Sequence, residues 1–411
     1  MINQATDRFI NEHVNDDIRQ LALTKVPEDV DMLEALTQIE GRQTAIHKLP
    51  RWAATEGLRW PRKLSLEQCS SEATADYKHG IVKRLLQSLH QEEMECRLAD
   101  LTGGLGVDFA ALAPLFKKAT YVEMMPELCE LAHNNFKRLG LCNVDIVCDD
   151  ALHFLSSLVG CEYSSRYYTL LYIDPARRNT AGRKVAGIED CHPNVCQLQD
   201  AFSKLTRFCL IKLSPMMDIT AAVRAMCNVV EVHVVEYKGE CKELLLLIDY
   251  TCDTPVEPLI YCTDLTAKRT FVFTRTEEAQ TLAPMANGLG QYLYEPGAAL
   301  LKAGAFNLVA SRYGLHKIAR QTHFYTSDVF VDSFQGRTWQ VEDYCSFAKH
   351  DIRRMLAGLD RAELSVRGFP MSVAQLRKQL HLKEGGNVHL IATSIGDGEK
   401  NTKRVLIKAR Q

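Results

Sequence analysis

The stretch Asp100-Leu-Thr-Gly-Gly-Leu-Gly-Val-Asp108 decides the fold class of this chain. It follows a short apolar run at 97–99 and leads into Phe109-Ala-Ala-Leu-Ala113, in which the apolar residues have helical spacing. A strand, a glycine-rich turn and a helix start, in this order, predict an α/β sheet that binds its ligand at the carboxyl edge. Glycines let the backbone approach such a ligand and adopt positive φ at little cost. The helix N-terminus behind them presents free N–H groups.

The residues around the glycines narrow the choice of ligand. Asp100 precedes the turn, and Gly106 is followed by Val-Asp-Phe, so the third glycine of the dinucleotide fingerprint G-x-G-x-x-G is missing. A turn with an acid in front and without a diphosphate cradle suits a ligand that combines an adenosine with a cationic amino-acid end. We therefore predict S-adenosylmethionine (SAM) as the cofactor. The turn residues that we expect to hold it are Asp100, Thr102, Gly104, Gly106 and Asp108.

The length and composition of the chain limit the number of domains and the kinds of partner that can be expected. With 411 residues the chain exceeds a typical domain, so two or three domains are expected. Its 46% hydrophobic and 24% charged residues are ordinary for a soluble globular protein, and its formal net charge of −2 means that a nucleic-acid partner needs a local basic face. We find neither an apolar run of about 18 residues nor a leader peptide pattern, so we predict a cytoplasmic protein without a membrane partner.

The cysteines indicate a reducing compartment. The 14 cysteines are scattered and form no C-x-x-C pair. The densest group, Cys191-His-Pro-Asn-Val-Cys196, fits no common zinc template, so we predict no metal ion. The oligomeric state is not defined by these features.

Hydrophobic periodicity divides the chain into segments. Residues 1–68 have apolar residues at helical spacing, and from about 70 to 250 strand-like and helix-like runs alternate, which predicts a parallel sheet covered by helices. The expected strands are 97–101, 119–123, 143–147, 168–173, 207–213, 229–235 and 243–250. The helices expected between the first six strands are 107–116, 126–139, 151–158, 194–204 and 218–227.

The last connection of this region differs from the others. Only Tyr237-Lys-Gly-Glu-Cys-Lys242 separates the last two strands, which is too short for a crossover, so the final strand should enter antiparallel through a hairpin. Seven strands with an antiparallel last strand are the class I methyltransferase architecture, and we predict this Rossmann-like fold. Small α+β modules follow it. Their expected elements are a strand at 270–274, helices at 296–303 and 371–380 (N-cap Ser372), and strands at 388–393 and 404–408.

Acidic residues end the second and third strands. Glu123 lies 17 residues past Gly106 and can accept hydrogen bonds from both ribose hydroxyls, although a solvated surface acid is the alternative. Asp149 and Asp150 offer an acceptor for the adenine amino group or a cap for the next helix. We assign Asp150 to adenine and Asp149 to capping or solvent, and we include both among the residues near the cofactor.

The fourth strand is followed by Asp174-Pro-Ala-Arg-Arg178, where a methyl acceptor should meet the donor. Pro175 fixes φ, Asp174 can hold an N–H or O–H nucleophile, and Arg177 can clamp an anion such as phosphate. We predict Asp174, Pro175 and Arg177 as catalytic and Arg178 as substrate-binding. The alternative is a tight turn with an exposed basic pair.

Two flanking segments can complete the site. Ser71 and Glu72 start a helix at 72–89; they can cap that helix or face the amino-acid end of the cofactor. Lys212, at the end of the fifth strand, should lie across the cleft from Asp174. It can bind a substrate anion or extend from a buried strand to solvent.

These motifs resemble the bacterial class I methyltransferases that carry a THUMP-like C-terminal domain. The residues that carry the resemblance are the glycine turn, Tyr172-Ile-Asp-Pro-Ala-Arg-Arg178, Lys212-Leu-Ser-Pro-Met216, Glu67-Gln-Cys-Ser-Ser-Glu72, and the tail from Gly368-Phe-Pro-Met-Ser372 to Leu382-Lys-Glu-Gly-Gly386. The serine–glutamate element also resembles the one that lies beside the cofactor in relatives of trimethylguanosine synthase. The resemblance implies four parts: a helical region (1–68), the SAM-binding domain (69–252), a small ferredoxin-like or connecting domain (253–335) and a THUMP-like domain (336–411).

The resemblance implies a SAM-dependent methyltransferase, and THUMP domains in general imply RNA. Residues 337–411 contain 14 Lys and Arg against 8 Asp and Glu, which fits a phosphate backbone or a solvated face. One departure from amino-group methyltransferases is that Asp-Pro-Ala-Arg replaces Asn/Asp-Pro-Pro-aromatic, so the aromatic that stacks a flipped base is absent. DNA, a protein or a small molecule as substrate, and a non-catalytic RNA-binding protein with a degenerate pocket, are the alternatives.

Overall fold

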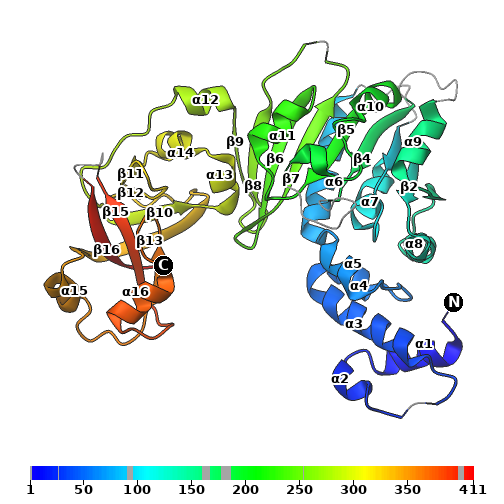
Figure 1. Ribbon diagram of the computed structural model, residues 1–411, viewed down its shortest axis with the longest axis horizontal. Coiled ribbons are helices and arrows are strands. Elements are labelled where there is room, and N and C mark those ends of the chain that lie inside the picture. The colour runs from blue at the N-terminus through cyan, green and yellow to red at the C-terminus, as the bar shows by residue number, and fades with distance from the viewer. Residues whose placement is uncertain are drawn as a thin grey trace. The chain divides into compact units, whose positions relative to one another are not determined.

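The computed structural model describes residues 2–25, 27–89, 96–159, 167–176, 187–252, 254–396 and 402–411, apart from the side chains of Leu64 and Val159. The chain forms two compact units (Figure 1). Residues 1–230 and 244–256 make the first unit, and residues 231–243 and 257–411 make the second. The division runs through the strands β6 (Val229–Tyr237) and β7 (Glu240–Asp249).

The first unit begins with short helices, as predicted for residues 1–68. They are α1 (Gln4–Glu12), α2 (Ile18–Leu21), α3 (Met32–Lys48), α4 (Pro50–Ala54) and α5 (Lys63–Gln68). Asn3, Asp17 and Asp31 cap the first three of them through their side chains, which explains why these helices begin where they do. Trp52 and Trp60 bury their rings in one cluster with Leu105 and Val107, so these helices pack against the back of the glycine turn.

The sheet of the first unit confirms the predicted strands closely. Its elements are α6 (Glu72–Ser88), β1 (Arg97–Asp100), α7 (Val107–Leu112), η1 (Ala113–Leu115), β2 (Lys118–Glu123), α8 (Pro126–Arg138), β3 (Val144–Cys148), α9 (Ala151–Val159), β4 (Tyr168–Ile173), η2 (Ile188–Asp190), α10 (Gln199–Leu205), β5 (Thr206–Leu213) and α11 (Ile219–Ala225). Strands β1 to β5 pair in parallel. All six residues of β4 are buried, as expected for a central parallel strand.

The predicted hairpin is present and is tighter than expected. Both strands extend toward each other and leave Lys238 and Gly239 as a two-residue turn, with φ of +54° and +77°. Two consecutive positive φ angles are the geometry of a hairpin turn that matches the twist of the strands. Strand β7 then pairs antiparallel with β5, so the strand order is β3-β2-β1-β4-β5-β7-β6. This order confirms the class I methyltransferase fold.

The sheet does not end at seven strands. Strand β8 (Leu259–Asp264) pairs in parallel with β6, and β9 (Arg269–Phe273) pairs antiparallel with β8, which gives nine strands in all. Strand β9 matches the strand expected at 270–274. The strand at 259–264 was not predicted.

The second unit also contains a separate seven-stranded sheet of order β11-β12-β10-β13-β16-β15-β14. Its strands are β10 (Tyr292–Pro296), β11 (His316–Lys317), β12 (Tyr325–Ser327), β13 (Gly336–Ser346), β14 (Glu363–Val366), β15 (His389–Ile395) and β16 (Lys403–Arg410). The helices of this unit are α12 (Arg275–Gln280), α13 (Ala298–Ala303), α14 (Phe306–Tyr313), α15 (Lys349–Met355) and α16 (Val373–Leu380). Ser372 caps α16 as predicted, in a capping box with Gln375. The helix expected from Pro296 begins two residues later, because Pro296 ends β10.

Candidate functional site

The glycine turn is a close-packed backbone cradle at the carboxyl end of β1. Gly104 and Gly106 have φ of +55° and +80°, and Gly106 is the N-cap of α7. A Cβ atom at Gly106 would lie 2.6 Å from the ring of Phe136, and one at Gly103 would lie 2.2 Å from the ring of Tyr121. Only glycine fits both positions, because the rings of Phe136 and Tyr121 pack directly against the backbone of the turn.

Two buried carboxylates are tied to this turn. Asp100 is 1% exposed, and its Oδ1 accepts a hydrogen bond of 2.9 Å from the backbone N–H of Thr102. Burial raises the pKa of Asp100 well above its usual value, so a cationic ligand would favour its ionised form. Glu123 ends β2 and accepts from the N–H of Gly104 at 2.8 Å and of Met125 at 2.9 Å. Both acids therefore lie at the turn, as the order of the strands predicted.

Asp149 and Asp150, which follow β3, make different contacts from those that we predicted. Asp150 accepts hydrogen bonds from the N–H groups of Leu152 at 2.8 Å and His153 at 3.4 Å, so it caps α9. Asp149 instead pairs with the ring of His153 at 2.7 Å, and this contact lowers the pKa of Asp149. The helix cap that we expected at Asp149 is Asp150.

Ser71 and Glu72 are both engaged in helix capping. Ser71 accepts from the N–H of Thr74 and begins α6. Glu72 is 8% exposed and accepts from the N–H groups of Arg51 at 2.6 Å and Trp52 at 3.1 Å. These two N–H groups belong to the first turn of α4, so the carboxylate of Glu72 neutralises that helix N-terminus. It is Ser70, one residue earlier, that reaches the charged cluster described next.

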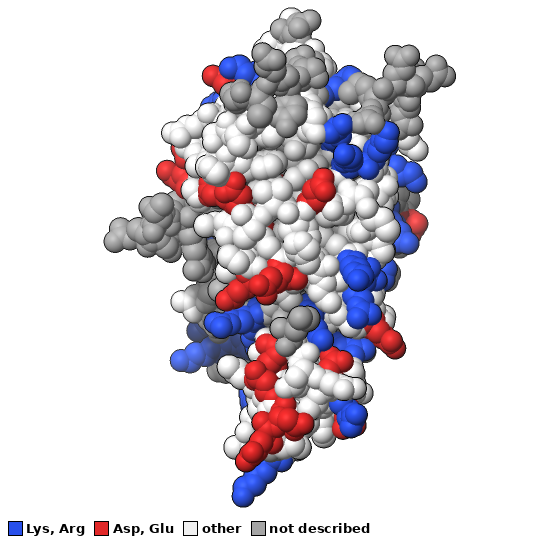
Figure 2. Space-filling view, turned by 90° about the vertical axis from the view of Figure 1, so that its right-hand side faces the viewer, with Lys and Arg blue, Asp and Glu red and all other residues white. Residues whose placement is uncertain are grey.

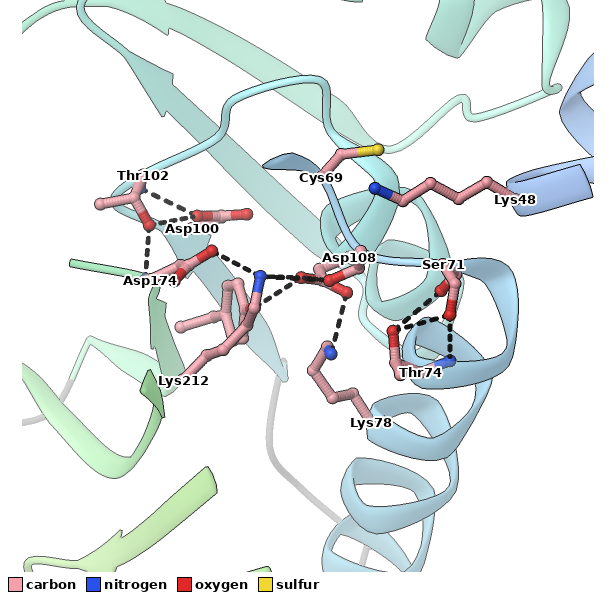
Figure 3. Close-up of polar contacts among 12 residues, drawn as sticks. Lys48, Cys69, Ser71, Thr74, Lys78, Asp100, Thr102, Asp108, Asp174 and Lys212 are labelled. Atoms are coloured by element: carbon pink, nitrogen blue, oxygen red, sulfur yellow. Dashed lines mark hydrogen bonds and ion pairs between the residues drawn. The ribbon is translucent and has the colours of Figure 1, made fainter. Parts of the chain in front are cut away.

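A charged cluster lies where the acceptor was expected (Figure 3). Nζ of Lys212, on β5, lies 2.5 Å from Oδ2 of Asp174, 3.2 Å from Oγ of Ser70 and 3.6 Å from Oδ2 of Asp108. The backbone N–H of Asp174 donates to Oγ of Thr102 at 2.7 Å, which joins the ends of β1 and β4. The structure thus places Lys212 in direct contact with Asp174, whereas we expected it across a cleft from Asp174.

Asp108 is the centre of this cluster. Its carboxylate accepts from Ser70 at 2.7 Å and from the hydroxyl of Tyr172 at 2.6 Å, and Nζ of the fully buried Lys78 lies 3.3 Å away. Burial alone would raise the pKa of Asp108, but Lys78, Lys212 and these two hydroxyl donors lower it to about 2. Asp108 therefore stays ionised at neutral pH as the counterion of two ammonium groups.

The remaining predicted acceptor residues are placed only in part. Pro175 is buried, and Ala176 forms an antiparallel bridge with His192, with hydrogen bonds of 2.7 and 3.0 Å. Arg177 and Arg178 lie outside the described residues. Among the described residues, no group of three or more His, Cys, Asp or Glu side chains is placed to hold a metal ion.

Sequence reasoning missed Ser70, Lys78 and Tyr172. A signal existed for Lys78, because it shares the buried face of α6 with Ala75 and Val82, at positions where apolar residues are expected. A lysine in such a stripe requires a buried counterion. No comparable pattern identifies Ser70 or Tyr172.

Comparison with known proteins agrees with the fold. Residues 292–334 match a ferredoxin-like domain, and residues 336–410 match a domain described as THUMP domain-like. The crystal structure of a Porphyromonas gingivalis W83 protein assigned as a methyltransferase is similar over 100% of both chains, with a TM-score of 0.84 and 30% identity. Proteins from two strains of Mycobacterium tuberculosis, each named an uncharacterized S-adenosylmethionine-dependent methyltransferase, are 24% identical over 304 residues, which is 73% of this chain and 77% of theirs.

The fold and the site define a class I methyltransferase. The chain belongs to the family of SAM-dependent methyltransferases that carry a ferredoxin-like and a THUMP-like domain at the C-terminal end. The two matched segments share one sheet, because β10 of the first pairs with β13 of the second.

Proposed function

We propose that this methyltransferase acts on RNA, with the cofactor on the glycine turn and the acceptor at the Asp174-Pro175 turn. The observation that carries the choice of RNA is the THUMP-like match at residues 336–410, a segment with a marked excess of basic over acidic residues. On the face shown in Figure 2, basic and acidic side chains are interspersed among the described residues. Because the formal net charge of the chain is −2, RNA contacts are expected from a local basic region rather than from the general surface charge. In the described part of the chain, no helix is long and apolar enough to cross a membrane.

The residues of the turn fit SAM. The cradle excludes a Cβ atom at Gly103 and Gly106, and the buried Asp100 favours a cation beside it. Glu123, fixed by two backbone N–H groups, would bind the ribose hydroxyls, and Asp150, after the next strand, would accept a hydrogen bond from the adenine amino group. When bound, SAM supplies a methyl group activated by its sulfonium.

The protein's own residues then act mainly by orientation. Asp174 is fixed through its N–H to Thr102 and through its carboxylate to Lys212, so it can hold the acceptor at a defined place. Pro175 limits the backbone at this turn, and Arg177 and Arg178 would contact the phosphate backbone.

The cofactor site is tested by calorimetry with S-adenosylhomocysteine. Glu123→Gln should weaken binding about tenfold or more, because a charged acceptor of two hydrogen bonds is lost. Glu130→Gln, on the exposed side of α8, is the matched control and should bind normally. Binding that is insensitive to Glu123 would contradict the proposed site.

The substrate is tested on RNA. RNA from cells that lack the protein should miss one methylated nucleoside, and the purified full chain with SAM should restore it, as measured by mass spectrometry of nucleosides. If every RNA modification survives deletion and the protein methylates no RNA, the proposed substrate is wrong.

A further inference from the structure

The position of Lys212 constrains the chemistry of the methyl acceptor. Its side chain is 13% exposed, whereas that of its partner Asp174 is 39% exposed. The ammonium is therefore enclosed, and the carboxylate is the more accessible member of the pair. Any acceptor held by Asp174 must also lie close to the charge of Lys212, because the two groups are only 2.5 Å apart.

The ammonium of Lys212 is held in place by a buried framework. Asp108 contacts it from one side and Asp174 from the other, as Figure 3 shows, and Oγ of Ser70 lies 3.2 Å from it. Asp108 is itself fixed by Tyr172 and by the fully buried Lys78. Asp108 and Lys78 are thus positioning residues for Lys212. A charge fixed in this way needs little rearrangement during the reaction, which is the condition for strong electrostatic stabilisation.

This fixed charge discriminates between two kinds of acceptor. Methylation of a neutral exocyclic amine places a developing positive charge on nitrogen, which the nearby ammonium of Lys212 would repel. Methylation of an N–H acid proceeds through its anion, which the same ammonium stabilises. When Asp174 takes the proton, its own charge is lost and Lys212 remains beside the acceptor anion.

We propose that Lys212 directs methyl transfer to the lactam nitrogen of guanine or uracil in RNA. Such a base presents an N–H to the carboxylate of Asp174, and the anion that forms when this proton is lost lies close to the positive charge of Lys212. The proposal rests on RNA as the substrate. It agrees with the absence of the aromatic residue that amino-group methyltransferases have after this turn, where this chain has Arg177.

The step is balanced as follows. The lactam N–H proton moves to Asp174, whose Oδ2 is paired with Lys212 and whose Oδ1 would accept it. The nitrogen lone pair forms the bond to the methyl carbon while the carbon–sulfur bond breaks, and its electron pair stays on sulfur. The sulfonium becomes a neutral thioether, the base becomes an N-methyl lactam, and Asp174 releases the proton to water.

The position of the methyl group tests this proposal directly. RNA from cells lacking the protein is incubated with the full chain and SAM, digested, and compared with standards by chromatography and mass spectrometry. A methyl group on N1 of guanine or N3 of uracil is expected. A methyl group on an exocyclic amine, on a ring nitrogen of adenine or cytosine, or on a ribose hydroxyl overturns the assignment and leaves RNA as the substrate. No methylation of RNA overturns both proposals.

Lys212 variants provide a second test. Lys212→Met should lower kcat about 10²- to 10³-fold, the usual loss for a positioned transition-state donor, whereas the affinity for S-adenosylhomocysteine, measured in the absence of RNA, should change less than threefold. Lys212→Arg should recover part of kcat because it restores the charge. Lys204→Met, at an exposed position on α10, is the matched control. A kcat for Lys212→Met within threefold of the unchanged chain, with the same melting temperature, overturns the proposal.

Discussion

The two halves of the sheet edge are built differently. At the glycine turn, the carboxylates of Asp100 and Glu123 are bonded to backbone N–H groups. Next to the ends of β4 and β5, the carboxylates of Asp108, on α7, and of Asp174 are paired with lysines. Backbone donors are part of the fold itself, whereas buried ions depend on one another. The loss of a side chain at the glycine turn should therefore lower the stability of the fold less than the loss of a side chain at the ends of β4 and β5.

The largest effect is expected at Asp108. Asp108→Asn removes the counterion of the fully buried Lys78 and should destabilise the protein by about 3–5 kcal/mol. The double variant Lys78→Met/Asp108→Leu replaces the buried pair with apolar groups and should regain most of that loss. Urea unfolding of both variants, with the exposed Asp200→Asn as control, measures the difference. Equal stability of the single and double variants would show that Lys78 does not depend on Asp108.

The next largest effect is expected in the glycine turn. Gly106→Ala combines a positive φ with a Cβ atom placed 2.6 Å from Phe136, and it should cost about 2–4 kcal/mol. Gly140→Ala has a similar φ of +76° with no heavy atom within 4 Å, so it measures the backbone cost alone, about 1 kcal/mol. If thermal or urea unfolding gave the same loss for both, the close approach to Phe136 would be unimportant.

The two halves should also differ in their response to pH. The pKa of Asp108 is lowered to about 2, below its unfolded value near 4, so its stabilisation of about 2 kcal/mol is complete above pH 4 and is lost as the pH falls through about 2. The raised pKa of Asp100 has the opposite effect on stability, because the folded state disfavours ionisation of this group and loses stability as the pH rises. Between pH 5 and pH 2 the unfolding free energy of the unchanged chain should therefore decrease by about 2 kcal/mol more than that of Lys78→Met/Asp108→Leu. Parallel pH curves would argue against this ion pair.

The smallest effect is expected at Asp150, where capping and ligand binding can be separated. Asp150→Ala should cost about 1 kcal/mol of stability, whereas Asp150→Ser retains a capping oxygen and should cost little. If the carboxylate also binds adenine, both variants should weaken S-adenosylhomocysteine binding by a similar factor of up to about tenfold. Normal binding by both variants would leave Asp150 as a cap only.

The local sequence pattern predicted most of the helices and strands of the first unit but few of the contacts between its side chains. Strand β4 was predicted at its observed bounds, Tyr168–Ile173, because a mostly apolar run that ends at Asp174-Pro175 is a strong signal. The acids at the strand ends followed from the order of the elements. The contact of Lys78 with Asp108 joins residues 30 positions apart on two helices, and no periodicity encodes such a pair. The strand at 259–264 was missed because half of its residues are polar or exposed, so the local pattern is weak. Its pairing with β6, which the local pattern does not encode, makes this segment a strand.

The N-terminal helices have a consequence for anyone who handles the catalytic domain by itself. Trp52 and Trp60 cover Leu105 and Val107 on the rear of the glycine turn, and Glu72 is bonded to the backbone of α4. An expression boundary chosen at the start of α6 would expose these apolar residues to solvent and leave the carboxylate of Glu72 without the N–H groups of α4. The first seventy residues are therefore part of the packed core of the catalytic domain. A protein truncated at this point would be prone to precipitate before its methyltransferase activity could be assayed.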